Sequence, residues 1–288
     1  MMSGGDHGEH VNKQRDDWNA VADAWERYDS WLSDNFASFD KALIERAGIR
    51  PGHKTLDLGS GTGNPALAAA RMVGPQGSVV GVDVADKMLD VARRRAQTMG
   101  IDNVEFHVCH AGAIPFADDS FDAATSRFCL MFLPDVAAAL GGVHRALKPG
   151  ARFTAAVWSA PDKNLSFTLA MKVLQNFADA PSPDPSAPGP FSLGAPGKLK
   201  GYMEEAGFTD AIEEAIPVEM SFPSVEFYIS NMKEMAAPVR AILEQMDEQS
   251  RARAMDAIVE EVKKFETPDG AIRFNSEAMI VSGMKASA

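Results

Sequence analysis

Thr55-Leu56-Asp57-Leu58-Gly59-Ser60-Gly61-Thr62-Gly63-Asn64-Pro65 is the stretch that decides the fold. An apolar run ends near an acidic residue, three glycines follow at alternate positions, and Asn64-Pro65 opens an alanine-rich pattern. Asparagine is a common N-cap, and proline suits the first helical turn because its missing N–H would have no partner there. Glycine adopts positive φ easily and lets a ligand approach the main chain. The stretch therefore predicts a strand, a tight ligand-binding loop and a helix.

The acidic residues of this region indicate the kind of ligand. A dinucleotide-binding fingerprint needs a glycine where this chain has Asn64, so a nicotinamide dehydrogenase is disfavoured. Asp57 lies at the carboxyl end of the predicted strand, where a carboxylate repels a pyrophosphate and attracts a cation such as a sulfonium amino acid. Asp83 ends the next apolar run and can accept hydrogen bonds from ribose hydroxyls. We infer a ligand with a nucleoside at one end and a positively charged amino acid at the other.

Four groups of motifs follow one another along residues 50–160 and carry a family resemblance. They are Asp57-Leu-Gly-Ser-Gly-Thr-Gly63, Gly81-Val-Asp-Val-Ala-Asp-Lys-Met-Leu89, Ile114-Pro-Phe116 with Ser120-Phe-Asp122, and Arg145-Ala-Leu-Lys-Pro-Gly150. As a set they resemble the class I S-adenosyl-L-methionine (SAM)-dependent methyltransferases of small molecules, close to those that C-methylate ubiquinone and menaquinone precursors. The resemblance implies SAM as cofactor and S-adenosyl-L-homocysteine (SAH) as product.

The same resemblance implies a set of cofactor-binding residues. They are Asp57, Gly59, Ser60 and Gly61 around the methionine end, Asp83 at the ribose, and Val84 and Met88 at the adenine. The family usually has an acid after its third strand, contacting the adenine amino group, where this chain has His110. A neutral imidazole can still accept one hydrogen bond. The backbone N–H of Ala111 could serve an adenine ring nitrogen.

Strand and helix patterns alternate through the middle of the chain. The expected strands are 54–58, 77–83, 103–109, 121–127 and 151–158, and the expected helices are 64–73, 86–99 and 134–147. Alternation predicts a doubly wound α/β fold with parallel strands, whose ligand crevice lies beyond the carboxyl ends of the strands. Asp57, Asp83, His110 and Arg127 all stand at such ends, so we expect them in one cleft. A cation at Arg127 could pair with the SAM carboxylate, with an acidic substrate, or within the fold.

The segments on either side of this core are expected to be helical. Residues 1–12 are expected to be disordered, and two helices should span 18–47. Beyond 160 we expect a helix at 164–178, a Pro-rich linker or lid at 181–196, a helix at 196–206, a strand at 209–220, helices within 224–265, and a last strand at 271–284. By resemblance the last two strands form an antiparallel edge pair, which completes a seven-stranded, mostly parallel, Rossmann-like sheet. The predicted units are an N-terminal helical segment (1–47), a SAM-binding core (48–160) and a helical cap or lid with the last two strands (161–288).

Bulky apolar residues near the expected cleft suggest an acceptor site. They are Trp25, Tyr28, Phe128, Met131 and Trp158, each of which could equally be core. An apolar wall favours a hydroxylated aromatic or polyketide-like acceptor, methylated at oxygen or carbon. Methyl transfer needs alignment and exclusion of water more than a nucleophile, so no catalytic residue is assigned, although Tyr28 and His110 are within reach as bases. N-methylation of a small amine, and a SAM-binding partner or sensor without catalysis, remain alternatives.

Composition restricts the partners. The chain has 288 residues, 45% of them apolar, and a formal net charge of −12, which disfavours nucleic acid and anionic membranes as partners. Without a signal-peptide or membrane-span pattern we expect a cytoplasmic location, with a small-molecule substrate and a possible homodimer. Cys109 and Cys129 are expected to be core thiols, because too few cysteines are present for a disulfide framework. A metal or arsenic site with His107 and His110 lacks the usual ligand spacing, so no metal is expected.

Overall fold

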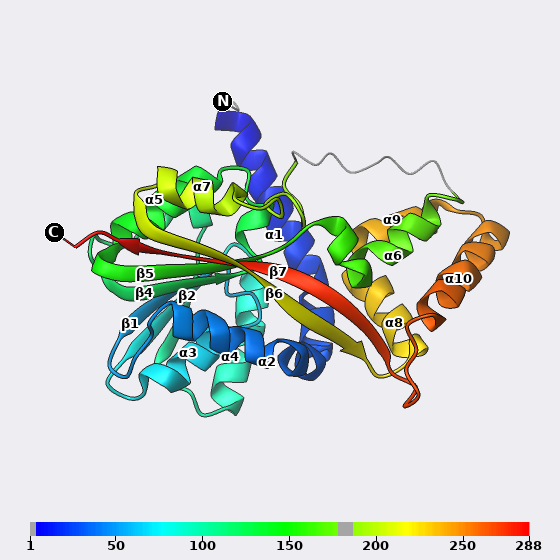
Figure 1. Cartoon of the computed structure of the whole chain (residues 1–288), viewed down its shortest axis with the longest axis horizontal. Helices are drawn as coiled ribbons and strands as arrows, with labels where there is room; N and C mark the ends of the chain where they lie inside the picture. The colour runs from blue at the N-terminus through cyan, green and yellow to red at the C-terminus, as the bar shows by residue number, and fades with distance from the viewer. Residues whose placement is uncertain (1–3, 178–186, 288) are drawn as a thin grey trace.

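The computed structural model describes residues 4–177 and 187–287, with side chains from residue 11 onward. Its centre is one seven-stranded sheet in the order β3-β2-β1-β4-β5-β7-β6 (Figure 1). The strands are β1 (Lys54–Leu58), β2 (Ser78–Asp83), β3 (Val104–Val108), β4 (Phe121–Arg127), β5 (Leu147–Trp158), β6 (Phe208–Phe222) and β7 (Ile272–Lys285). The first five strands pair in parallel, and β7 is antiparallel to both of its neighbours. The predicted fold class and the antiparallel edge pair are confirmed.

Helices cover both faces of this sheet. The helices α2 (Asp29–Arg46), α3 (Ala66–Val73) and α4 (Asp86–Thr98) lie on one face, and α5 (Val136–Ala146) and α7 (Lys198–Glu205) lie on the other (Figure 1). Because both faces are covered, the central strands read as continuous apolar runs rather than alternating ones. Leu56 and Leu58 of β1 are buried beside Phe153 of β5 in the larger of the core clusters. The order of strands reverses between β1 and β4, which puts the expected cleft at their carboxyl ends.

The remaining helices form two further groups. The cap consists of α6 (Leu165–Leu174), α8 (Val225–Met235), α9 (Ala237–Gln245) and α10 (Glu248–Lys263), gathered beyond one end of the sheet (Figure 1). The helix α1 (Gly4–Arg27) runs between the core and this cap and contacts both α4 and α8. Short 3₁₀ turns follow β3 (Ala111–Ala113), β4 (Leu130–Phe132) and β5 (Pro161–Lys163). Within the described residues, no helix combines the length and apolar character needed to cross a bilayer.

Two local expectations are wrong. Helix α1 begins at Gly4, so the described part of the N-terminal segment expected to be disordered is helical. Once the face with Val21 and Ala22 packs against α4, adding helical turns costs little, because the nucleation penalty has been met. Helix α3 begins at Ala66 with Pro65 in the capping position, and no side chain caps it, so Asn64 is not its N-cap. The predicted domain boundaries fall between elements and stay predictions, and residues 181–186 of the Pro-rich segment lie outside the described residues.

The side-chain amide of Asn35 forms the hydrogen bonds to the edge strand β6 that a neighbouring strand would otherwise form. The Ser221 N–H donates to Asn35 Oδ1 at 2.8 Å, and Asn35 Nδ2 donates to the Ser221 carbonyl at 3.3 Å. The indole N–H of Trp31 donates to the same carbonyl at 2.6 Å. These contacts satisfy backbone groups that an edge strand would otherwise present to other chains. They also fix α2 against the sheet.

Replacement of Asn35 by Ala should leave the Ser221 N–H without its partner. We expect the free energy of unfolding to fall by about 0.5–1.5 kcal/mol, the usual net contribution of a hydrogen bond, because the Ser221 N–H is only partly buried. Urea denaturation followed by circular dichroism measures this change. Asp34→Ala, at the exposed neighbouring position, serves as the control and should stay within about 0.5 kcal/mol of the parent. Equal stability of the two variants would show that the Asn35 amide contributes nothing.

Candidate functional site

The loop after β1 contains glycines, so main-chain atoms without covering side chains lie at the carboxyl edge of the sheet. Gly59, Gly61 and Gly63 have φ of +76°, +49° and +115°, a region that favours glycine. The N–H groups of Gly59 and Ser60 donate to the Val82 carbonyl at 2.8 and 3.0 Å, which ties the loop to β2. A Cβ at Gly61 would meet no heavy atom within 4 Å, so this side of the loop is open. The loop can therefore carry a ligand directly on its backbone.

Gly59 is required for a second reason that the sequence did not indicate. A Cβ built there would lie 2.3 Å from Cys129 Cβ and 2.4 Å from Cys129 Sγ. The loop after β4 thus packs directly against the glycine loop. Burial raises the pKa of the Cys129 thiol, and the nearby Asp83 and Asp57 carboxylates raise it further. Cys129 is accordingly a neutral thiol, partly buried against the glycine loop.

Asp57 is a buried carboxylate with one oxygen unused. Its Oδ1 accepts from Thr125 Oγ1 at 2.8 Å, whereas Oδ2 has no hydrogen-bond partner within the described residues. Burial raises the pKa of Asp57 to about 6, although the hydrogen bond from Thr125 and the nearby Ser60 hydroxyl, which donates to the Asp57 backbone carbonyl, lower it. A buried acceptor without a partner is costly. A cationic donor at Oδ2 would remove that cost, so the residue fits the positively charged end of SAM.

Asp83 joins the glycine loop to the start of α4. Its Oδ2 accepts from the Gly61 N–H at 2.8 Å and its Oδ1 accepts from the Ala85 N–H at 2.9 Å. Each carboxylate oxygen can accept a further bond, so ribose hydroxyls can still be bound. Val84 beside it is half-buried, and Met88 is buried against Ala85 and the α1 face. These residues lie together as predicted, and their roles toward adenine stay predictions.

His110 is less suited to the adenine amino group than expected. Its Nδ1 accepts a hydrogen bond from the Gly112 N–H at 3.2 Å, at the start of the 3₁₀ turn that contains the buried Ala111. A backbone N–H can only donate, so a neutral ring carries its proton on Nε2. The one acceptor nitrogen of the neutral imidazole is therefore engaged within the loop. An acceptor role toward adenine would require this local bond to break.

Arg127 makes the ion pair within the fold that was one of its predicted alternatives. Its Nη1 lies 2.7 Å from Asp40 Oδ1 on α2, and both side chains are buried. The guanidinium also lies 5.3 Å from the centre of the Phe36 ring. Asp40 was missed by sequence reasoning. The signal was available, because Asp40 stands on the apolar stripe of Phe36, Phe39 and Leu43 at helical spacing.

A second buried arginine was also missed. Arg95 of α4 donates from Nη1 to the Thr62 carbonyl of the glycine loop, and its Nη2 lies 2.8 Å from Asp29 Oδ1. With Asp40, Asp57 and Arg127 these side chains form one electrostatically connected cluster. Three carboxylates and two guanidinium groups leave an excess of one negative charge when Asp57 is ionised. The cluster is therefore suited to a cationic ligand.

An aromatic stack stands at the end of β4, beside this cluster. Phe128 has φ of +55°, which is unusual for a bulky residue, and its N–H donates to the Ala156 carbonyl at 2.9 Å. Its ring stacks on Trp158 with centroids 4.1 Å apart and an angle of 8° between the planes. The Phe39 ring also stacks on the Phe128 ring, with centroids 5.5 Å apart and an angle of 12° between the planes. Backbone strain of this kind is found at functional sites, where surrounding structure maintains it.

The other predicted acceptor residues make contacts of their own in other elements. Met131 is buried, and its carbonyl accepts from the Gly189 N–H at 2.9 Å. Tyr28 is buried and donates its hydroxyl to Glu234 Oε1 of α8 at 3.1 Å. Trp25 is half-buried, in α1. Phe128 and Trp158 are thus brought into contact, whereas Tyr28 links α1 to the cap.

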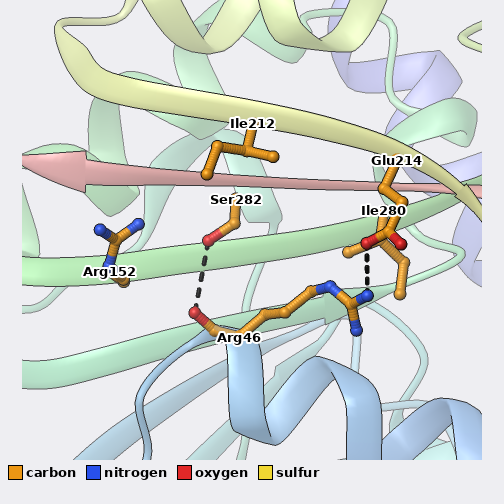
Figure 2. A pocket seen from close by; sticks show the side chains of 6 residues that line it. All are labelled: Arg46, Arg152, Ile212, Glu214, Ile280 and Ser282. Carbon is orange, nitrogen blue, oxygen red and sulfur yellow. Dashed lines mark hydrogen bonds and ion pairs between the residues drawn. The ribbon is translucent and has the colours of Figure 1, made fainter.

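A hollow elsewhere on the molecule contains none of the predicted site residues. It is a cavity of about 320 Å³ on the face of the sheet at the end of α2, lined by Arg46, Arg152, Ile212, Glu214, Ile280 and Ser282 (Figure 2). Arg46 pairs there with Glu214, and its carbonyl accepts from Ser282 Oγ at 3.4 Å (Figure 2). The hollow forms because α2 ends at Arg46 and leaves this part of the sheet uncovered.

Known proteins share both the sequence pattern and the fold. Residues 49–182 match a family model described as a methyltransferase domain. The chain is 36% identical over 186 residues to the ubiquinone/menaquinone biosynthesis C-methyltransferase UbiE of Marinomonas sp., a match that covers 57% of this chain and 70% of that protein. UbiE of Vibrio cholerae is 34% identical over 211 residues, covering 69% of this chain and 81% of the relative. UbiE of Vibrio parahaemolyticus is matched over 60% of its length.

Solved structures agree in fold. A structure from Bacillus halodurans, described as a candidate methyltransferase, has a TM-score of 0.58 and 21% identity, and the match covers 87% of this chain and 100% of that one. At this identity the likeness concerns the fold alone. The sequence identity to UbiE carries the further conclusion: this chain belongs to the family of SAM-dependent small-molecule methyltransferases that includes the UbiE enzymes.

Proposed function

We propose that the acceptor is a hydroxylated aromatic ring, such as a quinone precursor or an aromatic polyketide, methylated at carbon or oxygen. The observation that carries this proposal is the parallel stack of Phe128 on Trp158 at the ends of β4 and β5. Trp158 and Phe39 both stack on Phe128, so the stack offers a flat apolar acceptor the partly exposed edge of Phe128, where edge-to-face contact is favourable. The UbiE relatives are named for C-methylation in ubiquinone and menaquinone biosynthesis, which agrees with such an acceptor.

We infer that the methionine end of SAM lies at Asp57 and Gly61, with its ribose at Asp83 and its adenine near Val84 and Met88. The unpartnered Oδ2 of Asp57 and the open side of Gly61 support the first placement. The position of Asp83 at the end of β2, bonded to the glycine loop, supports the second. Arg127 remains available to the SAM carboxylate only if it shares its contact with Asp40.

Bound SAM supplies a methyl group on a positively charged sulfur, which makes the leaving group good. The chain's residues then have to hold charge, orient the acceptor and exclude water. Asp57 holds positive charge, and Phe128 with Trp158 would orient a flat acceptor. Burial and the Glu234 carboxylate raise the pKa of Tyr28 to about 12, so its hydroxyl stays protonated at neutral pH. Tyr28 is therefore a hydrogen-bond donor rather than a base.

The alternatives rest on other features. N-methylation of a small amine would be favoured by acids from the cap within the site. Glu234 of α8 reaches inward from the cap, but it already pairs with Arg27 and accepts from Tyr28. A SAM-binding partner or sensor would keep the glycine loop and transfer no methyl group. The homodimer and the cytoplasmic location stay predictions.

The proposal is tested by supplying SAM labelled in its methyl group with panels of phenols, hydroquinones and small amines. We expect label in the phenolic or hydroquinone products. Phe128→Ala should lower kcat/KM by about 10- to 100-fold, since one aromatic contact in an apolar pocket contributes about 1–3 kcal/mol. Phe177→Ala, at an exposed position, is the matched control and should leave transfer unchanged. Label found only in amines would reject the acceptor class, and SAM binding with no transfer to any acceptor would favour the sensor.

The raised pKa of Asp57 predicts how cofactor affinity depends on pH. Above pH 6 the carboxyl is ionised and ready for a cation, so affinity should be flat. Below pH 6 it is protonated, and binding has to release that proton, so the affinity for SAM should fall by about tenfold per pH unit. Calorimetry between pH 5 and 8 measures this dependence. The Asp57→Asn variant should bind SAM weakly at every pH and should lose the fall in affinity below pH 6. A wild-type affinity for SAM that stays constant from pH 5 to 8 would contradict the assignment of Asp57.

Asp83→Ala should weaken SAM binding by about 1–3 kcal/mol, because the variant loses the acceptors of the ribose hydroxyls. Its effect on folding is separated by measuring the melting temperature without cofactor. Asp90→Ala, which removes the same charge from an exposed position on α4, should bind SAM as the parent does. If Asp83→Ala also binds as the parent does, Asp83 does not belong to the site.

A further inference from the structure

Arg95 lies where three separate segments of the chain meet. Its Nη1 donates to the Thr62 carbonyl in the glycine loop, and its Nη2 lies 2.8 Å from Asp29 Oδ1 and 3.4 Å from Ser33 Oγ. Asp29 and Ser33 belong to the first turns of α2, whereas Arg95 belongs to α4. The side chain is only 8% exposed. One planar guanidinium therefore joins the cofactor loop to the N-terminal segment, which we define as α1 and α2.

The contact to Thr62 falls at a sensitive point of the loop. Thr62 lies between Gly61 and Gly63, which both have positive φ, and Thr62 is only 5% exposed. Glycines give the loop many accessible conformations, so an external hydrogen bond to its carbonyl restricts which one is populated. The Gly61 N–H on the preceding residue donates to Asp83. Displacement of the Thr62 peptide would therefore also disturb the Asp83 contact.

The contact to Asp29 falls where α1 meets α2. Asp29 follows Tyr28, whose hydroxyl bonds Glu234 of the cap, and Arg27, which pairs with the same carboxylate. Further along α1, Asn19 accepts from the Lys87 N–H at the start of α4 at 3.1 Å. The polar contacts of α1 with the core and the cap are thus partly exposed, beside the buried apolar contact of Val21 and Ala22 with α4, whereas the Arg95–Asp29 pair is largely buried. Buried, charge-assisted bonds are stronger and more directional than exposed ones.

We propose that Arg95 is a positioning residue that couples the glycine loop to the N-terminal segment, so that binding of the cofactor and docking of the α1–α2 junction stabilise each other. The proposal rests on the proposed placement of SAM at the glycine loop. Coupling of two sites is reciprocal: if docking of the junction improves cofactor affinity, bound cofactor must strengthen the docking by the same factor. A lysine could not replace Arg95, because an ammonium lacks the planar fork that reaches the Thr62 carbonyl and Asp29 together.

Hydrogen exchange with and without SAH tests both directions of this coupling. In the wild-type chain, saturating SAH should slow amide exchange at residues 28–35. Arg95→Lys should bind SAH at least tenfold more weakly, and saturating SAH should no longer slow exchange there. Arg94→Lys is the matched control, since Arg94 is the exposed neighbour and pairs with Glu26 of α1 at 2.7 Å. Its SAH affinity and its protection pattern should stay within twofold of the parent.

Asp29→Asn provides a second variant that leaves the bond to Thr62 in place. It should also weaken SAH binding, and the double variant with Arg95→Lys should lose less than the product of the two separate losses, because both act through one contact. A purely structural role would lower the melting temperature of these variants yet leave the SAH-dependent protection at 28–35 intact, and that result would overturn the coupling. Failure of the wild-type chain to bind SAH would instead overturn the proposed function on which the coupling rests.

Discussion

A carboxylate buried with one oxygen unpartnered is the constraint on which the cofactor site depends. Asp57 lies inside the sheet at the end of β1, where its charge is costly unless a cation meets it. Thr125 on β4 satisfies one oxygen and leaves the other free. The fold thus holds an acceptor that water cannot reach and that the described residues do not fill. This arrangement agrees with the proposed placement of the positively charged end of SAM at Asp57.

Two arginines connect the carboxyl edge of the sheet to α2 of the N-terminal segment through ion pairs. Arg127 at the end of β4 pairs with Asp40, and Arg95 on α4 pairs with Asp29, so α2 is held at its first residue and in its second half by charges near the ends of the strands. Buried pairs stabilise little in net terms, because desolvation offsets attraction, but they penalise any arrangement in which one partner is missing. Their contribution here is orientation, because the observed docking of α2 pairs both buried charges at once. That docking also delivers Phe39 to the stack on Phe128.

Local patterns were sufficient to predict the parallel core of the fold, and the family resemblance supplied the antiparallel edge pair. The strand and helix positions in the core are correct to within a few residues, because apolar periodicity, glycine turns and proline mark each boundary. The cluster at the strand ends was predictable as well, since a parallel sheet brings those ends together. The partners within the cluster were not. Asp40 and Arg95 are distant in sequence from the residues they bind, and nothing local specifies such pairing.

The sequence by itself determined the individual core strands, the glycine loop and the positions of Asp57 and Asp83, because each of these follows from spacing within one short stretch. Only the tertiary structure decided which charges neutralise each other, that His110 uses its acceptor nitrogen within its own loop, and that Phe128 turns back onto Trp158. The charge pairs and the Phe128–Trp158 stack depend on distances between segments far apart in the chain, and packing sets those distances. The His110 bond joins residues only two apart, but it depends on a side-chain rotamer that the local sequence leaves open.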